Sequence, residues 1–169
     1  MSVAADSTKT GFLSDDELKE GPGIPSAARR RKGAVAVIEC LEDIPCNPCE
    51  SSCKYDAITV GEDITTLPKL TEDNCVACRS CIPICPGQAI FLVDESLPDD
   101  KATVLMPYEY RPLPEKGEVV KALDRAGKEL GNATVTAVRK TEKMDQTALV
   151  TIELPREWSM RARAFKLKR

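Results

Sequence analysis

Apolar, β-branched runs recur along the chain and predict short strands. The first run, AVAVIEC, begins after Gly33 and predicts a strand that leads into a group of cysteines. Further strands are predicted at residues 57–60, 89–93, 118–124, 133–139 and 147–154. The last residues, RARAFKLKR, alternate in a way that adds a final strand, and Pro155 can begin a short helix before it.

The first 32 residues have a different character and predict an extended N-terminal tail. Within it, Ser14 and Glu17 can cap a short helix that runs through Glu20 and ends at GPGIP. The run Arg-Arg-Arg-Lys at residues 29–32 closes the tail. It indicates either a solvated linker or a strap onto an acidic partner surface.

Two further segments follow the cysteines. Residues 95–116 contain four prolines and predict an extended connection, with at most a short edge strand at 103–106. Residues 117–169 predict a small β-sheet or barrel domain, in which the turn-like RAGKELGN joins the first two strands. We expect Trp158 to fill the core of this domain.

Composition narrows the possible chemistry. The 169 residues include no histidine, which removes Ser-His and Cys-His nucleophile pairs and mixed cysteine-histidine zinc sites. No Walker-type loop or GxGxxG turn occurs, so a bound nucleotide or flavin would have to come from another polypeptide. No run approaches the roughly 18 apolar residues of a membrane span, and the first residues lack a secretory signal pattern. We therefore expect a cytoplasmic chain with no membrane span.

Charge is distributed unevenly along the chain. The net charge is −3 overall, but −9 for residues 33–116 and +5 for residues 117–169. An acidic surface favours docking to basic partner faces. We expect no nucleic-acid partner, because only 4% of the residues are aromatic and no recognition motif occurs.

Eight cysteines lie between Cys40 and Cys85, and in a reducing compartment they indicate metal ligands rather than disulfides. The stretch CVACRSCIPICP, residues 75–86, fits C-x2-C-x2-C-x3-C-P. Three thiolates so close together can bind three corners of one cuboidal iron-sulfur cluster, while the fourth binds another cluster. Zinc is the weaker alternative, because structural zinc sites pair two separated C-x2-C knuckles.

The cysteine region contains an internal repeat. A shift of 32 residues superposes Cys46 on Cys78, Cys49 on Cys81, Cys53 on Cys85, Ala57 on Ala89 and Ile58 on Ile90. Each half supplies ligands, a short helical turn and a strand. The repeat therefore predicts a two-cluster bacterial ferredoxin fold whose halves pair about a pseudo-twofold axis.

The repeat fails at one corner, because Cys75 falls on Asp43 and the available cysteine, Cys40, stands three residues earlier. We assign one 4Fe-4S cluster to Cys40, Cys46, Cys49 and Cys85, and a second to Cys53, Cys75, Cys78 and Cys81. Two alternatives stay open: Asp43 supplies an oxygen ligand and Cys40 is free, or the corner is labile and the cluster has three irons. Lys54 stands where a proline usually follows the last cysteine of the first motif, which can change local geometry and potential.

Residues 36–94 resemble the bacterial-type two-cluster ferredoxin family through VIEC, IPCNPCESSC and NCVACRSCIPICPGQAI. The variant IECLEDIPCNPCESSC is also similar to small iron-sulfur subunits of FAD-dependent amine or amino-acid dehydrogenase complexes, such as those acting on proline or hydroxyproline. The resemblance covers about a third of the chain and carries over only to the eight cysteines. It implies electron relay between a flavin subunit, which holds the FAD, and another redox partner.

Together these features predict an α+β chain with four parts: an extended tail (1–32), a pseudo-twofold, ferredoxin-like two-cluster domain (33–94), a proline-rich connection (95–116) and a small β domain (117–169). We expect an electron-transfer subunit of a hetero-oligomeric oxidoreductase, not catalytic alone, because four protein ligands per cluster leave no open iron for substrate. The alternatives are a free-standing soluble ferredoxin that serves several reductases, and an enzyme that opens the irregular corner to substrate.

Overall fold

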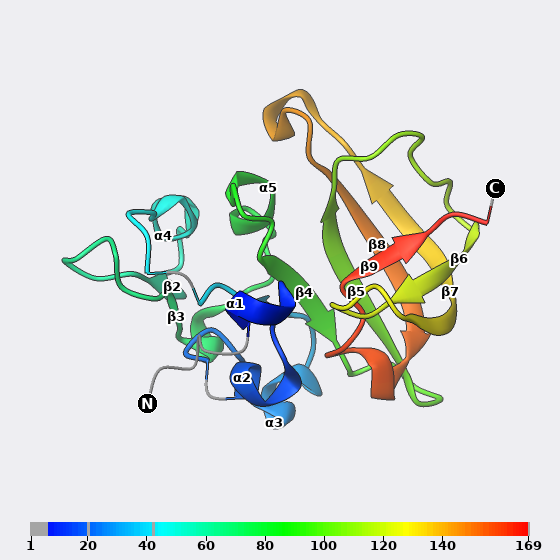
Figure 1. Cartoon of the computed structure of the whole chain (residues 1–169), viewed down its shortest axis with the longest axis horizontal. Coiled ribbons are helices and arrows are strands. Elements are labelled where there is room, and N and C mark those ends of the chain that lie inside the picture. The colour runs from blue at the N-terminus through cyan, green and yellow to red at the C-terminus, as the bar shows by residue number, and fades with distance from the viewer. Residues whose placement is uncertain (1–6, 20, 42, 169) are drawn as a thin grey trace.

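A seven-stranded antiparallel sheet runs through almost the whole length of the chain (Figure 1). The structure is a computed structural model and describes residues 7–19, 21–41 and 43–168. The strand order in this sheet is β1-β4-β5-β8-β7-β6-β9. Its strands are β1 (Val35–Ile38), β4 (Ile90–Asp94), β5 (Lys101–Tyr108), β6 (Val119–Leu123), β7 (Glu129–Arg139), β8 (Ala148–Pro155) and β9 (Ala164–Lys166).

The remaining elements are short. A separate hairpin pairs β2 (Ile58–Thr59) with β3 (Lys69–Leu70). The α-helices are α1 (Ser7–Thr10), α2 (Asp15–Lys19), α3 (Ala27–Arg30), α4 (Pro48–Ser52) and α5 (Cys81–Ile84), and the 3-10 turns are η2 (Glu72–Asn74), η3 (Glu142–Met144) and η4 (Arg156–Trp158). Within the part of the chain that the structure describes, no helix has the length and apolar character needed to cross a membrane.

The predicted strands near the cysteines form and pair as a ferredoxin-like repeat requires. The first half of the repeat runs β1-α4-β2 and the second runs β3-α5-β4. The outer strands β1 and β4 pair with each other, and the inner strands β2 and β3 pair with each other. This exchange of partners between the halves is the arrangement that a twofold axis generates.

The connection after the cysteines differs from the expectation. Only a short edge strand was expected at 103–106, but β5 is eight residues long and lies between β4 and β8. Pro107 is accommodated near the end of β5, opposite Leu149, while the other three prolines of this segment lie outside the strand. Pro107 lacks a backbone N–H and so cannot donate a hydrogen bond within the sheet. Burial of alternate side chains outweighs this loss, because Ala102, Val104, Met106 and Tyr108 are all buried.

β6, β7 and β8 were all predicted as strands, but β7 begins earlier than the predicted strand at 133–139. It begins at Glu129, because the turn is confined to residues 124–128. There the carboxylate of Asp124 accepts hydrogen bonds from the N–H groups of Ala126 and Lys128. The predicted short helix after Pro155 is the 3-10 turn η4, and the predicted last strand is β9.

One large core lies inside the curl of the seven-stranded sheet. Val37 of β1 and Phe165 of β9 belong to strands at opposite edges of the strand order, yet both pack in this core. The ring of Phe165 stacks on Tyr108 with centroids 4.8 Å apart, and Trp158 packs against the same core, as predicted. Because the sheet is continuous from β1 to β9, it does not confirm the division into domains 33–94 and 117–169, which stays a prediction.

The second core lies on the opposite face of β1 and β4, beneath the cysteines. Ala36 and Ile38 of β1 and Ile90 and Leu92 of β4 point to this side, where they meet Ile82 of α5. Residues next to them along each strand point into the large core. Both faces of β1 and β4 are therefore buried, which explains their continuous apolar sequence.

The described residues 14–19 and 21–32 of the predicted extended tail pack against the rest of the chain. Ser14 and Glu17 form the expected capping box, with each side chain bonded to the other's backbone N–H. The expected helix ends at Lys19, and the predicted extension through Glu20 lies outside the described residues. Gly23 accepts a 2.9 Å hydrogen bond from the N–H of Ile38, so this segment covers the free edge of β1.

In the basic run at 29–32, Arg29 and Arg30 make defined contacts with this chain, so the run is not simply a solvated linker. Arg29 donates to the carbonyl oxygens of Glu72 (3.0 Å) and Cys75 (2.7 Å). Arg30 forms a 2.8 Å ion pair with the buried Glu95. These two side chains hold the N-terminal segment on this chain's own surface, while Arg31 and Lys32 are exposed.

Candidate metal centre

The two halves of the cysteine region are related by the predicted pseudo-twofold symmetry. The N–H of Glu39 bonds to the carbonyl of Ala89 at 2.8 Å, and the N–H of Thr71 bonds to that of Ala57 at 2.9 Å. Each of these residues lies 32 positions from its counterpart in the other bond. The 32-residue shift in the sequence is therefore a real structural equivalence.

The symmetry extends to the ends of the two short helices. Cys53 ends α4 and Cys85 ends α5, with φ and ψ of −86° and 102° in the first case and −73° and 113° in the second. Three residues later, Asp56 and Gln88 both adopt left-handed backbone conformations, with φ of 51° and 50°. Both halves thus turn out of the helix in the same way and lead into β2 or β4.

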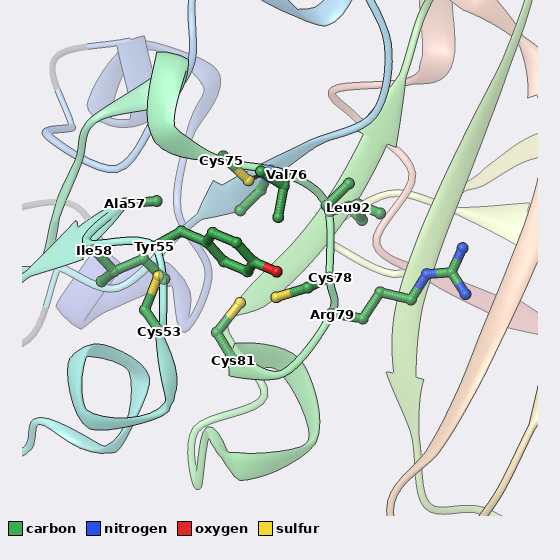
Figure 2. Close-up of a pocket in the computed structure, with 12 residues that line it drawn as sticks. Cys53, Tyr55, Ala57, Ile58, Cys75, Val76, Cys78, Arg79, Cys81 and Leu92 are labelled. Carbon is green, nitrogen blue, oxygen red and sulfur yellow. Dashed lines mark hydrogen bonds between the residues drawn. The ribbon is translucent and has the colours of Figure 1, made fainter.

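Four cysteines from both halves line one cavity, which we call cavity II. They are Cys53, which follows α4, Cys75 and Cys78 from the loop that leads into α5, and Cys81, the first residue of α5. Figure 2 shows the four side chains directed toward a common space, with the ring of Tyr55 lying over it and the side chain of Arg79 extending away. These are the four residues that the sequence assigned to the second cluster.

The other four cysteines line a second cavity, which we call cavity I. They are Cys40, which follows β1, Cys46 and Cys49, which flank the start of α4, and Cys85, which ends α5. Each cavity therefore receives three cysteines from one half of the repeat and one from the other. This crossing of ligands is what the C-x2-C-x2-C-x3-C spacing predicts for neighbouring iron-sulfur sites.

At the irregular corner of the repeat, Cys40 rather than Asp43 lines cavity I. Cys40 is among the residues that line cavity I, and so is Ile44, whereas Asp43 is exposed and does not line it. Lys54, which replaces a proline in the motif, is exposed and lines neither cavity. The structure thus brings together all eight cysteines in the two predicted groups of four.

Backbone geometry in the loop of residues 75–81 suits anionic sulfur ligands. Ala77 and Arg79 both adopt positive φ, 57° and 74°, and both line cavity II. Alternation of left-handed residues with their neighbours curls a loop and turns its N–H groups inward, which favours bound anions. From outside the loop, the N–H of Ala36 donates to the sulfur of Cys75 at 3.4 Å.

The electrostatics of the thiols reflect the same grouping. Burial, together with the neighbouring Cys75, Cys78 and Cys53, raises the pKa of Cys81 to about 12. Burial, with smaller contributions from Cys85, Cys46 and Cys40 and partly opposed by the N–H of Glu50, raises the pKa of Cys49 to about 11. Without a metal these thiols keep their protons, so metal binding must release them.

The residues around the cavities fit an iron-sulfur cluster. The donors are all sulfur, they come in groups of four, and the inner side of both groups is closed by the apolar core beneath β1 and β4. Soft thiolate sets of this kind select iron-sulfur clusters or zinc, and the crossed ligand pattern is the one that neighbouring clusters use.

Sequence reasoning missed three residues near these cavities. Tyr55, 48% exposed, borders cavity II; Arg29 bonds to the Cys75 carbonyl; and Glu39, next to Cys40, is buried against two arginines. The basic run and the position of Glu39 beside a ligand were visible signals. Their partners were not, because they come from segments far away in the sequence.

The β1-α4-β2 and β3-α5-β4 repeat and the two groups of four cysteines resemble those of ferredoxin-type iron-sulfur proteins. A family model described as a 4Fe-4S dicluster domain matches residues 44–97. Residues 44–97 are therefore similar to 4Fe-4S ferredoxin-type domains. The match begins after Cys40, so the irregular corner lies outside it.

Two curated proteins are similar to part of this chain. One belongs to the Na+-translocating ferredoxin:NAD+ oxidoreductase complex of Acetobacterium woodii and is 40% identical over 48 residues, which are 28% of this chain and 14% of that protein. The other belongs to an ion-translocating oxidoreductase complex of Methanosarcina acetivorans and is 39% identical over 59 residues, 35% of this chain and 20% of that protein. The chain thus spans a fifth or less of these relatives. No solved structure matches it.

Proposed function

We propose that the chain binds two 4Fe-4S clusters and relays single electrons between a flavin-containing oxidoreductase subunit and a second redox partner. In this proposal Cys40, Cys46, Cys49 and Cys85 hold the cluster of cavity I, and Cys53, Cys75, Cys78 and Cys81 hold that of cavity II. The observation that carries it is the division of all eight cysteines into two crossed groups of four. FAD belongs to the partner subunit, because the sequence contains no nucleotide-binding loop.

The chain's own residues determine how electrons enter and leave. When bound, a 4Fe-4S cluster supplies a centre that accepts and releases one electron at a time. Four thiolates per site leave no iron position for a substrate, which supports transfer rather than catalysis by this chain alone. On the inner side, Ile58 and Ile82 exclude water, whereas Cys78 is exposed, so cavity II is accessible from one side.

Exposed apolar side chains at the cavities support docking of partners. Ile44 at cavity I is 48% exposed, and Tyr55 and Val76 at cavity II are 48% and 55% exposed. Exposed apolar side chains next to a redox centre suit a transient interface that brings two centres close together. The net charge of −9 in residues 33–116 favours partners with basic faces.

The relatives support a place in a hetero-oligomer, because both are named as subunits of multi-subunit oxidoreductase complexes. The resemblance of IECLEDIPCNPCESSC to subunits of FAD-dependent amine or amino-acid dehydrogenases supports a flavin-containing partner. A cytoplasmic location agrees with eight reduced cysteines.

The test is anaerobic isolation of the tagged chain from its own host, followed by stopped-flow measurement of the isolated assembly. We expect a flavin-containing polypeptide to co-purify, and its reduced flavin to bleach the visible absorption of the iron-sulfur sites. Isolation as a lone chain that reduces several unrelated reductases equally well would instead show the free ferredoxin and refute the relay subunit.

A further inference from the structure

A buried cluster of charges is centred on Glu39, the residue that precedes Cys40 of cavity I. Its centre is the carboxylate of Glu39, which accepts hydrogen bonds from the Nε of Arg125 at 2.8 Å and from the Nε of Arg163 at 2.7 Å. Arg125 reaches Glu39 with a second nitrogen as well, so this pair is bidentate. We call these three residues the Glu39 clamp.

The Glu39 clamp is removed from solvent. The side chains of Glu39, Arg125 and Arg163 are 7%, 10% and 5% exposed. Burial acts to raise the pKa of Glu39, but the hydrogen bonds and charges of the two arginines outweigh it and hold that pKa below its usual range. The clamp is therefore a charged unit whose parts depend on one another, as buried ion pairs do.

Other contacts fix the two arginines in place. Arg163 donates to the carbonyl oxygens of Ser159 and Ala162, and its guanidinium lies 4.8 Å from the centre of the Phe91 ring. Arg125 donates to the carbonyl of Met160 and pairs with Asp15 of α2. Both arginines come from the C-terminal part of the chain, one from the β6-β7 turn and one from the residue before β9.

Glu39 is held by its backbone as well as by its side chain. Its N–H bonds to the carbonyl of Ala89, and the next residue, Cys40, lines cavity I. In the other half of the repeat the equivalent position is Thr71, which is exposed and uncharged. There the chain continues through η2 before it reaches Cys75. The half that lacks a cysteine at the regular corner is thus the half that carries the clamp.

We propose that Glu39 is a positioning residue that, through Arg125 and Arg163, fixes Cys40 as the fourth ligand of cavity I. This inference rests on the proposed function, because it assigns Cys40 to the first cluster. It also gives the C-terminal strands a role at the metal centre: they supply the arginines that hold the irregular corner. Residues beyond the ligands that orient them commonly control metal affinity.

The test measures how well each cysteine is protected by its bound iron. Anaerobically prepared protein is treated with iodoacetamide, and the alkylation rate of each of the eight cysteines is followed by peptide mass spectrometry. In E39Q we expect Cys40 to be alkylated about 10- to 100-fold faster than in the wild type, with unchanged rates at Cys75 and Cys78. R125Q keeps the Glu39–Arg163 pair and provides a second, milder variant.

The matched control is R30Q. Arg30 forms an ion pair of similar burial with Glu95 and also donates to a backbone carbonyl, that of Pro25, just as Arg125 does to Met160. We expect this control not to accelerate alkylation at Cys40. Equal acceleration in the control, or equal acceleration at all eight cysteines, would reduce the clamp to a general stabilising contact and overturn the proposal.

The same experiment separates the two proposals. If wild-type Cys40 is protected and stays protected in both E39Q and R125Q, the clamp fails and the ligand assignment stands. If wild-type Cys40 is alkylated as fast as in denatured protein while the other seven cysteines are protected, Cys40 is not a ligand and both proposals fall at that corner.

Discussion

Cys40 and Asp43 compete for one ligand position, and only one of them lies at the cavity. Repeat symmetry favours Asp43, since it is equivalent to Cys75 by the shift of 32 residues. Chemistry favours Cys40, because thiolate is the proposed ligand at the other seven positions. In the structure Cys40 lines cavity I and Asp43 is exposed, which supports the proposed assignment to Cys40.

Exchange of Cys40 for alanine is therefore expected to remove at least one iron from the protein, while D43A keeps the full number. The physical reason is that an exposed carboxylate outside the cavity cannot complete the fourth ligand. Iron and sulfide analysis together with native mass spectrometry measures the difference. An unchanged iron count in C40A, with loss of iron in D43A, would assign the corner to Asp43 instead.

Val76, beside cavity II, allows a second comparison of single residues. The substitution V76D introduces a carboxylate at this exposed position, and a docked partner would have to remove water from that charge at a cost in binding free energy. We expect electron transfer to the physiological partner to slow by about fivefold or more, with the same iron content as wild type. V119D is the control, because Val119 is 42% exposed on β6 and lines neither cavity. Equal slowing in both variants would place the docking surface elsewhere.

The elements show which part of the fold local sequence can predict. The apolar runs predicted the strands β1, β2 and β4, and cysteine spacing predicted the two groups of four cysteines that line the cavities, because both signals lie in short stretches of sequence. The extent of β5 was not predictable from the prolines of residues 95–116, since its eight residues are stabilised by β4 and β8 on either side. The anchoring of the N-terminal segment was missed for the same reason: Glu72 and Glu95, which bind Ser26 and Arg30, are far away in the sequence.

At the level of elements, the cover over β1 depends on a close approach at Gly23. A Cβ at this position would lie 2.5 Å from the carbonyl oxygen and 2.6 Å from the Cβ of Ile38. We expect G23A to weaken this contact by about 1–3 kcal/mol and to speed amide hydrogen exchange along β1.

G87A is the matched control, because a Cβ at Gly87 meets nothing within 4 Å. Its effect is expected to stay within about 0.5 kcal/mol. Equally slow exchange along β1 in G23A and wild type would mean that the N-terminal segment does not protect this edge.

Over the whole molecule, the metal centre and the C-terminal strands share one sheet. Val37, Phe91 and Val93 belong to the strands of the cysteine region, but they pack in the core formed with β5 to β9. The Glu39 clamp connects the same two regions through buried charges. The sequence predicts separate domains at 33–94 and 117–169 because the first contains the cysteine repeat and the second contains apolar strand runs. Such local patterns do not reveal which strands pair between the two regions.

A fragment of residues 33–94 contains all eight cysteines and tests whether that region is independent. We expect it to aggregate or to bind less iron than the full chain, because removal of β5 to β9 exposes the apolar faces of β1 and β4. Size-exclusion chromatography and iron analysis after anaerobic reconstitution measure both effects. A monomeric fragment with the iron content of the full chain would support the predicted domain boundary.

Anaerobic native mass spectrometry of the purified full chain tests the central claim most directly. The account predicts one dominant species whose mass exceeds that of the apoprotein by two four-iron, four-sulfide clusters. In C40A the same spectrum should show loss of iron from one cluster only. A mass that corresponds to two zinc ions, to a single cluster or to the bare chain would contradict the account.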